Sequence, residues 1–258
     1  MYQNLEATLH DLFWSAHGAD AELPIIKAFL NHYPGTVLEL GCGSGRLMRP
    51  LRDDGYLVEG LDNAPEMLEL CRQLPEGEDL ILHQAGMEDF DTGSKYGAII
   101  IPAFSLQLVP FEQIPAVFEN ILRHLQPDGG LYLSTFIPWA EITGEVDEGE
   151  WYLDQESPMP DGRIARCHTQ FSIERLNQVL IREHRYEIAN ERGEVMESSD
   201  SQQNLTWLWP RELTMLLHHA GFSVEKIISD FDADADFDAN GQILTLIATP
   251  REDQESDD

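Results

Sequence analysis

The segment Val37–Leu47, VLELGCGSGRL, organises the rest of the chain. It begins with a short apolar run typical of a strand and stops at three glycines separated by single residues, Gly41, Gly43 and Gly45. Glycine permits positive φ and, having no Cβ, lets a ligand approach the backbone, while a following helix N-terminus offers unpaired N–H groups. The segment therefore predicts a strand, a tight glycine turn and a helix, with a polar ligand at the turn.

Length and charge narrow the class of protein. The chain has 258 residues, is 42% hydrophobic and carries a formal net charge of -31, from 47 acidic and 16 basic residues. This length suffices for one large domain with an insertion. The acidic excess repels phosphate backbones and anionic lipid headgroups, so we expect neither nucleic acid nor a membrane as partner. Such an excess is typical of a high-salt environment and equally of ordinary solubility, and both interpretations stay open.

The cysteines indicate a cellular compartment. Cys42, Cys71 and Cys167 are odd in number and far apart, with no CxxC pair. This pattern favours a reducing compartment, so we expect a cytoplasmic protein without a metal site. The N-terminal residues lack the basic stretch and apolar run of a signal peptide, and we expect no membrane span.

Strands and helices alternate over the first half of the chain. The run Ala98–Ile101 is apolar on both faces, as in a central strand of a parallel sheet. Five alternations predict an α/β fold with a doubly wound, Rossmann-like parallel sheet and a ligand at the carboxyl ends of its strands. After the first strand, the predicted strands cover residues 56–61, 80–82 as the start of a third, 97–101, and 131–136 beyond a PDGG turn at 127–130.

An acidic residue ends the second predicted strand. Asp62 lies 21 residues after Gly41, a spacing at which a carboxylate can accept both ribose hydroxyls of a nucleoside cofactor. A solvated carboxylate that caps the next helix is the less favoured alternative. Asn63 follows, and Met67 in the next helix either packs in the core or lies against an adenine ring.

The glycine spacing distinguishes two cofactor classes. A dinucleotide fingerprint would read GxGxxG, whereas this chain has GxGxG with Arg46 in place of the last glycine. With acidic Glu39 before it, and GLDNAPEML (60–68) and LRHLQPDGGLYLSTF (122–136) after it, the turn closely resembles that of class I S-adenosylmethionine-dependent methyltransferases. The resemblance is strong over residues 34–138 and looser for the last helix and strand pair.

This resemblance implies S-adenosylmethionine as the cofactor and a seven-stranded, mostly parallel sheet whose last strand is antiparallel. It implies that Glu39 and the backbone of the glycine turn hold the methionine half, that Asp62 binds the ribose, and that Asn63 and Met67 flank the adenosine. The other implied cofactor residues are Met87 and Glu88 beside the adenine, and Pro102, Ala103 and Phe104 close to the transferable methyl group.

Two positions depart from the family pattern. Members commonly carry an acid where Gly86 stands, which accepts from the adenine amino group, and another where Gly97 stands. Their absence leaves the adenine contact open, with Glu88 or backbone groups as substitutes.

Residues 139–209 leave the alternating pattern, and we expect them to determine the substrate. An acidic loop carrying Trp151 and Tyr152 precedes three predicted strands, 163–173, 179–189 and 195–209, which form an inserted antiparallel β-sheet. The loop aromatics either contact a cationic or ring-shaped substrate or anchor the loop.

His168 and Tyr152 are the candidate catalytic residues. His168 is either a general base or part of a solvated sheet face. Trp14 either closes over the ligand or packs in the core. The candidate substrate-binding residues are Trp14, Trp151, Tyr152 and His168.

The predicted organisation has four parts. Residues 1–138 comprise N-terminal helices and the cofactor-binding core, 139–209 the inserted strands, 210–250 the last helix and strand pair of the core sheet, and 251–258 an acidic tail. We expect methyl transfer to N, O or S of a small molecule, mainly by positioning, because the sulfonium is already a strong electrophile. The inserted sheet offers a surface for a homodimer contact. Two other functions stay open: a non-catalytic S-adenosylmethionine-binding regulator or partner subunit and, less favoured, an NAD(P)-dependent oxidoreductase.

Overall fold

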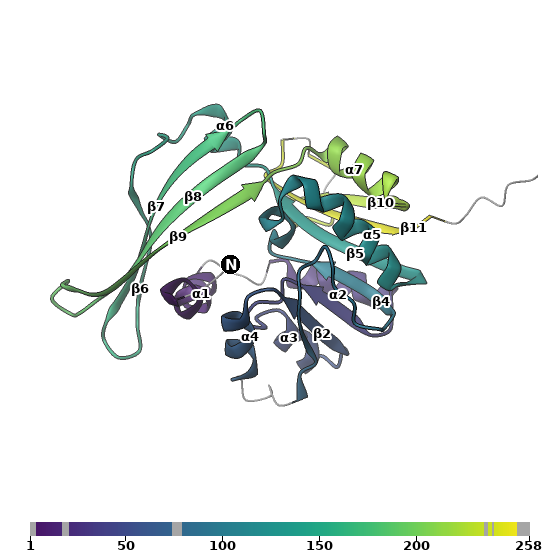
Figure 1. The fold of residues 1–258 in the computed structure, drawn as a ribbon, viewed down its shortest axis with the longest axis horizontal. Helices are drawn as coiled ribbons and strands as arrows, with labels where there is room; N and C mark the ends of the chain where they lie inside the picture. Colours follow the sequence, from purple (N-terminus) through teal and green to yellow (C-terminus); the bar gives the residue numbers. More distant parts are fainter. Residues whose placement is uncertain (1–3, 17–20, 74–78, 235–236, 239, 252–258) are drawn as a thin grey trace, which may run out of the picture.

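The computed structural model describes residues 4–16, 21–73, 79–234, 237–238 and 240–251, without the side chains of 14–16 (Figure 1). Beyond Arg251, the expected acidic tail lies outside the described residues. Among the helices in these ranges, none is long and apolar enough to cross a membrane.

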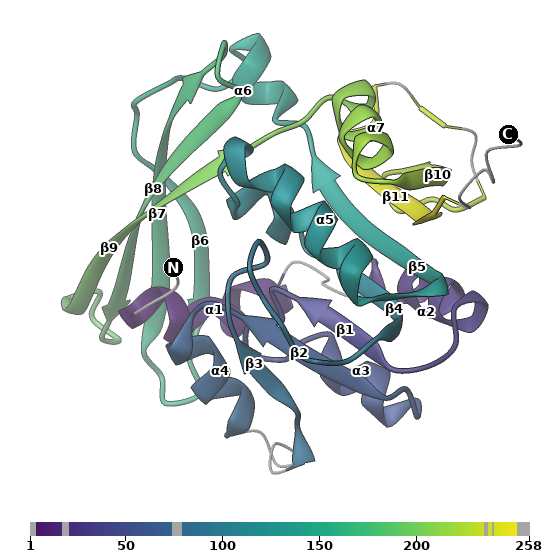
Figure 2. The ribbon, with the colours of Figure 1, turned by 45° about the vertical axis from the view of Figure 1, so that its right-hand side comes forward.

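The main sheet has the predicted seven strands and is mostly parallel. Only β11 runs antiparallel to its neighbours, β5 on one side and the edge strand β10 on the other. The doubly wound sheet with an antiparallel strand is therefore confirmed (Figure 2). Its strand order is β10 (Phe222–Ser229), β11 (Ile243–Pro250), β5 (Leu125–Phe136), β4 (Tyr96–Ile101), β1 (Val37–Leu40), β2 (Val58–Asp62) and β3 (Leu82–Gln84).

Helices cover both faces of this sheet. All six residues of β4 are buried, because apolar side chains on its two faces enter two different clusters: Ile99 packs with α5 and α7, and Ile100 packs with α2, α3 and α4. Burial on both faces explains the continuous apolar run seen in the sequence. The helices are α2 (Leu23–His32), α3 (Met48–Asp53), α4 (Pro65–Arg72), α5 (Ile114–His124) and α7 (Pro210–His219).

The predicted turn at 127–130 lies inside β5 and not before it. The pairing of β4 with β5 jumps from Tyr96–Leu125 to Ala98–Gly130, so residues 126–129, which include the first three of PDGG, form a bulge in a strand that begins at Leu125. A bulge inserts unpaired residues into one strand while pairing continues on either side. The PDGG residues therefore do interrupt the regular strand, as a turn would, but the strand begins before them, at Leu125.

The inserted sheet has four antiparallel strands, not three. The additional strand, β6, forms within the segment expected to be an acidic loop. It is an edge strand with mostly exposed side chains, so it lacks the apolar alternation that marks a strand in sequence. Its order and bounds are β6 (Tyr152–Pro158), β7 (Ile164–Glu174), β8 (Val179–Ala189) and β9 (Val195–Thr206), preceded by the short α6 (Trp139–Thr143).

Helix α1 (Asn4–Ala16) lies between the inserted sheet and the main domain (Figure 1). Its Leu5, Leu9 and Phe13, spaced by four residues, pack against side chains of β7 and β8. On another side of the helix, Ala7 packs against Ala64 and Met67 at the start of α4. Two apolar sides on one helix therefore join the two sheets, although the sequence placed this helix with the core.

Candidate active site

A pocket of about 400 Å³ lies where β1, β2 and β4 end. This is the edge at which doubly wound sheets bind ligands. Gly45 and Phe104 are not among its lining residues. The other predicted cofactor residues all line it: Glu39, Gly41, Gly43, Asp62, Asn63, Met67, Met87, Glu88, Pro102 and Ala103.

The glycine turn after β1 has left-handed backbone at each glycine, with φ of 75° at Gly41, 54° at Gly43 and 82° at Gly45. These angles disfavour any other residue. A Cβ on Gly41 would also lie only 2.7 Å from the Cβ of Ser105, so the turn fits closely against the segment after β4. The GxGxG pattern thus forms a turn whose backbone lines the pocket at Gly41 and Gly43.

Asp62, at the end of β2, contacts this turn. Its Oδ2 accepts a hydrogen bond from the Gly43 N–H at 2.9 Å, and its Oδ1 accepts from the Ala64 N–H at 2.8 Å, at the start of α4. Burial raises the pKa of its carboxyl, and the two N–H groups act in the opposite direction. Each oxygen keeps a second lone pair, so holding these two N–H groups and accepting hydroxyl groups from a ligand are compatible.

Glu39 is buried at the end of β1, with 2% of its surface exposed. Its Oε2 has no hydrogen-bond partner among the described residues. The pKa of this carboxyl is raised to about 8, chiefly by burial; Arg46 acts to lower it, and nearby Glu22 and Asp62 act to raise it. A buried acceptor without a partner costs on the order of 1–3 kcal/mol. Because Glu39 lines the pocket, a cationic ligand group is the natural partner for this oxygen.

The segment after β4 is held in an unusual conformation. Ala103 and Phe104 have φ of 52° and 63°, a region that non-glycine residues seldom adopt. Glu22 accepts hydrogen bonds from the Ala103 N–H at 3.1 Å and from the Tyr132 hydroxyl at 3.0 Å, and its burial raises its pKa. Sequence reasoning missed Glu22, because an acid just before a helix ordinarily indicates an exposed N-terminal turn.

The structure explains the two departures from the family pattern. A Cβ on Gly86 would lie 2.5 Å from Oε1 of Glu88, so the Glu88 carboxylate occupies the space next to residue 86. A Cβ on Gly97 would lie 2.1 Å from the carbonyl oxygen of Pro34, which leaves no room for any side chain. The Glu88 carboxylate thus fills the space beside residue 86, and the glycine at 97 serves the packing of the backbone.

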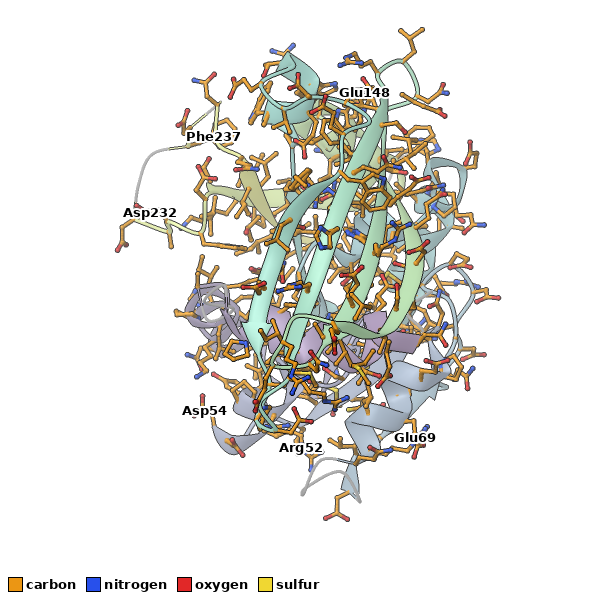
Figure 3. The ribbon with its side chains drawn as sticks, turned by 90° about the vertical axis from the view of Figure 1, so that its left-hand side faces the viewer. Arg52, Asp54, Glu69, Glu148, Asp232 and Phe237 are labelled. Carbon is orange, nitrogen blue, oxygen red and sulfur yellow. The ribbon has the colours of Figure 1, made fainter. Side chains whose placement is uncertain are left out.

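The structure does not bring His168, Trp151 or Tyr152 to the pocket. His168 lies on the outer face of the inserted sheet, the face seen in Figure 3, with its Nε2 3.7 Å from Glu187. Trp151 is 42% exposed, with the Arg185 guanidinium 5.0 Å from its ring centroid. Tyr152 lies on the exposed edge strand β6. The side chain of Trp14 lies outside the described residues.

The strand alternation gives the physical reason for this placement. In β7, Cys167, Thr169 and Phe171 are buried and His168 is not, so the odd-numbered residues face α1 and the main domain. The sequence correctly assigned the residues of β7 to two faces of the strand, but it did not show which face is directed toward the pocket. Five pocket residues from this side were missed: Glu6 and His10 of α1, and Gln202, Gln203 and Asn204 of β9.

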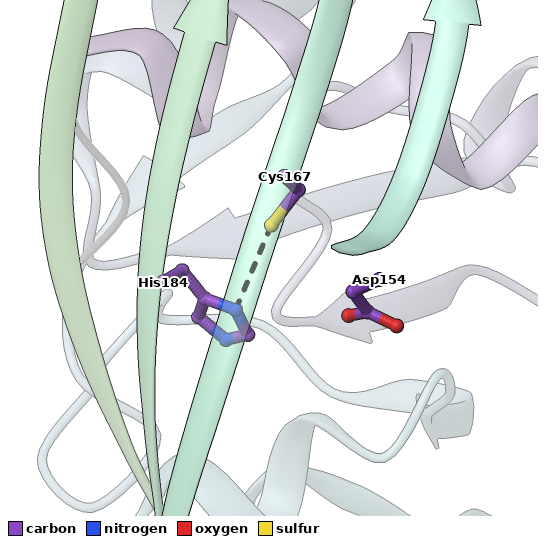
Figure 4. Close-up of side chains that lie close together, drawn as sticks. All are labelled: Asp154, Cys167 and His184. Atoms are coloured by element: carbon purple, nitrogen blue, oxygen red, sulfur yellow. Dashed lines mark hydrogen bonds between the residues drawn. The ribbon is translucent and has the colours of Figure 1, made fainter. Parts of the chain in front are cut away.

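On the inward face of the inserted sheet, Asp154, Cys167 and His184 form a polar cluster whose ligand atoms lie within 4.8 Å of one another (Figure 4). Such a group has the composition of a metal site, although the sequence predicts none. The Thr169 hydroxyl connects its members, because it donates to Asp154 Oδ2 at 3.0 Å and lies 2.8 Å from His184 Nδ1. Burial lowers the pKa of His184 to about 4 and raises that of Cys167 to about 11. Both shifts favour the neutral imidazole and the neutral thiol, and the Thr169 hydroxyl joins the imidazole to the Asp154 carboxylate.

Comparisons with known proteins agree with the site. Residues 37–129 match the methyltransferase domain family. The dTDP-3-amino-3,6-dideoxy-alpha-D-glucopyranose N,N-dimethyltransferase of Streptomyces fradiae is 28% identical over 160 residues, which cover 57% of this chain and 62% of that enzyme. The match thus spans less than two thirds of the relative's length.

Two solved structures share the fold over nearly the whole chain. An S-adenosylmethionine-dependent methyltransferase from Clostridium acetobutylicum has a TM-score of 0.78 at 13% identity, covering 96% of this chain and 99% of that one. Streptomyces venezuelae DesVI has a TM-score of 0.77 at 21% identity, covering 97% and 100%. Residues 37–129 are thus similar to a methyltransferase domain, and the whole chain has the fold of these two solved structures.

Proposed function

We propose that this protein transfers a methyl group from S-adenosylmethionine to an amino group of a small polar molecule of the amino-sugar class. The observation that carries the cofactor assignment is the pocket itself, in which the glycine turn, Glu39 and Asp62 converge at the ends of two parallel strands. The amine acceptor is supported by the Streptomyces fradiae relative, which is an amino-sugar N,N-dimethyltransferase.

The residues present fit the cofactor. Glu39 offers a buried, unpartnered carboxylate oxygen to the ammonium group of the methionine half. Asp62 offers its remaining lone pairs to the ribose hydroxyls, and Glu88 lies where the adenine amino group needs an acceptor. Met67, whose methyl group would lie 3.2 Å from a Cβ on Gly43, flanks the adenosine.

The bound cofactor supplies an activated methyl group, so the chain's task is to position the acceptor and exclude water. The strained Ala103–Phe104 backbone, held by Glu22, shapes the wall beside the expected methyl position. Helix α1 and β9 close the pocket from the opposite domain. An amine reacts through its neutral lone pair, so an ammonium acceptor must lose a proton before methyl transfer.

The two alternative functions differ in what they predict. A regulator would bind S-adenosylmethionine without forming product, and an oxidoreductase would bind a nicotinamide dinucleotide. Arg46 lines the pocket and stands where the last glycine of a dinucleotide turn would allow the helix to pack closely on the strand. The comparisons favour neither alternative.

A binding and turnover experiment tests the proposal. S-adenosylhomocysteine should bind the purified full chain in calorimetry and should not be displaced by NADH. Incubation with S-adenosylmethionine and a panel of amino sugars, free and nucleotide-linked, with matched hydroxyl analogues as controls, should release S-adenosylhomocysteine only with amines. Products should gain one or two methyl groups by mass. Product from the hydroxyl analogues alone would contradict the amine assignment, and no product across the panel would favour the regulator.

We also propose that the partners are small molecules and not nucleic acid or membranes, in keeping with the net charge of -31. A cytoplasmic location is supported by three cysteines that are all free and buried. The exposed outer face of the inserted sheet is available for a homodimer contact. Sedimentation at several protein concentrations tests the last point.

A further inference from the structure

We propose that Glu6 of helix α1 binds the amino group of the acceptor and accepts its proton, a role that rests on the proposed N-methyl transfer. Glu6 lines the pocket from the α1 and β9 side, whereas the residues that fit the cofactor come from the main sheet. It is therefore placed on the wall that the acceptor must occupy.

The carboxylate of Glu6 is held in a defined position. Only 4% of the residue is exposed, and its Oε1 accepts a hydrogen bond from Gln203 Nε2 at 2.8 Å. Gln203 also lines the pocket. A buried carboxylate that accepts from a neutral amide keeps acceptor capacity for a cationic ligand group, and charge-assisted hydrogen bonds are stronger than neutral ones.

The polar cluster of the inserted sheet supports Gln203 from behind. A side-chain hydrogen bond with Gln203 raises the pKa of His184, although burial, the larger effect, lowers it to about 4. His184 is in turn fixed by the Thr169 hydroxyl, which donates to Asp154. Hydrogen bonds thus join the cluster in Figure 4 to Gln203, and Gln203 to Glu6.

The other acids of the pocket already have partners in the cofactor. Glu39 fits the methionine ammonium, Asp62 the ribose and Glu88 the adenine, which leaves Glu6 and His10 on the acceptor side. His10 Nδ1 lies 2.9 Å from Asp11 Oδ1, so that ring nitrogen already has a carboxylate partner. Burial raises the pKa of Glu6, which makes it a better proton acceptor than an exposed glutamate.

The proton and electron changes balance. Ionised Glu6 takes one proton from the acceptor ammonium, which leaves a neutral amine and a protonated carboxyl. The amine lone pair forms the new N–C bond as the C–S bond breaks, and that electron pair returns to sulfur as the neutral thioether. The product is a methylated ammonium, and Glu6 gives its proton to solvent after the product leaves.

Sinefungin tests the assignment without knowledge of the acceptor. In this analogue an amine-bearing carbon replaces the methylated sulfur, so its ammonium group lies between the cofactor and acceptor positions. We expect Glu6→Gln to weaken sinefungin binding by about tenfold or more, the value of one charge-assisted hydrogen bond. Binding of S-adenosylhomocysteine, which lacks this amine, should change by no more than about twofold, well under 1 kcal/mol.

A matched control separates this effect from the loss of charge alone. Glu183→Gln removes a carboxylate from the inserted sheet at a residue that does not line the pocket, and it should leave the ratio of the two affinities unchanged. Glu6→Asp, which keeps the charge but shortens the side chain, serves if Glu6→Gln does not fold, and it should lower the ratio by a smaller factor.

The outcomes distinguish this inference from the proposed function. If wild-type protein binds neither S-adenosylhomocysteine nor sinefungin, the cofactor assignment fails and Glu6 loses its role with it. If both bind and the folded Glu6 variants keep the wild-type ratio of affinities, the cofactor assignment stands and the role of Glu6 is overturned. A ratio that falls equally in Glu183→Gln would also overturn it, because the effect would then come from net charge.

Discussion

Asp62 and Gly43, which lie 19 residues apart in the chain, are joined by a 2.9 Å hydrogen bond from the Gly43 N–H to the Asp62 carboxylate. The acid that ends β2 therefore holds the glycine turn that follows β1. One residue thus holds the glycine turn, and we propose that its remaining lone pairs also accept the ribose hydroxyls of the cofactor. This double role underlies the first prediction.

Asp62→Ala should weaken S-adenosylhomocysteine binding by about 100-fold, because it removes two ribose acceptors and releases the glycine turn. The variant should also be less stable by about 1–2 kcal/mol, since the Gly43 and Ala64 N–H groups lose their acceptor. Calorimetry and thermal unfolding measure the two effects. The exposed Asp128→Ala is the matched control and should change neither. Unaltered affinity in Asp62→Ala would remove Asp62 from the cofactor site.

Cofactor binding should release a proton from Glu39. Its pKa is raised from 4.5 to about 8 by burial, so between these values the carboxyl is protonated in the folded protein without ligand. The cofactor ammonium favours the ionised form, so affinity should rise with pH up to about 8. Calorimetry in buffers of different ionisation enthalpy measures the released proton.

Glu39→Gln should abolish this proton release and weaken binding by about tenfold or more. Glu183→Gln is the control and should release the proton as wild type does. Identical binding heats in all buffers for the wild-type protein would show that Glu39 is already ionised before binding.

His184 should make the protein sensitive to acid. Its pKa is lowered from 6.5 to about 4 by burial, so the unfolded chain binds more protons between these values. The stability it contributes is complete above pH 6.5 and is lost as the pH falls toward 4. His184→Gln should therefore reduce the difference in Tm between pH 7 and pH 5.

His168→Gln is the matched control on the outer face of the same sheet. It should keep the wild-type dependence of Tm on pH. It should also keep turnover with an amine acceptor, because His168 does not line the pocket. A large loss of turnover in His168→Gln would restore it as the catalytic base.

Gly97→Ala should destabilise the protein by about 3 kcal/mol, because overpacking against rigid backbone forces atoms to shift. Its Cβ would meet the Pro34 carbonyl oxygen at 2.1 Å. Gly86→Ala is the informative comparison, because its Cβ meets only the flexible end of Glu88. It should change Tm little and weaken cofactor binding by moving that carboxylate. Equal Tm values for the two variants would contradict the backbone contact at Gly97.

Raising KCl should raise the Tm if self-repulsion limits stability. The net charge is -31, and the Debye length falls from about 10 Å at 0.1 M salt to about 3 Å at 1 M. Screening then favours the compact state. Thermal unfolding across this range is the measurement. A flat or falling Tm would favour the interpretation that the acidic residues provide ordinary solubility.

Most of the main domain followed from sequence. The strand before Gly41, the second strand that ends at Asp62 and the apolar fourth strand all correspond to strands of the main sheet. Each depends on local periodicity, and the rule that parallel strands share one carboxyl edge places their ends together. The bulge in β5 was missed because its glycines and proline resemble a turn within the local window.

The pocket residues proposed to bind the acceptor could not be predicted from local sequence patterns. Glu6 and Gln203 are 197 residues apart and meet only because α1 packs between the two sheets. Alternation along β7 correctly placed His168 on the opposite face from Cys167 and Thr169. Alternation alone, however, does not tell which of the two faces meets the main domain. Local sequence patterns were thus enough to predict the residues proposed for the cofactor, because the glycine turn and the strand end that line this side of the pocket are each formed by a short stretch of chain. The acceptor half depended on packing between distant segments, since burial of the apolar sides of α1 sets the direction of every polar side chain beside them.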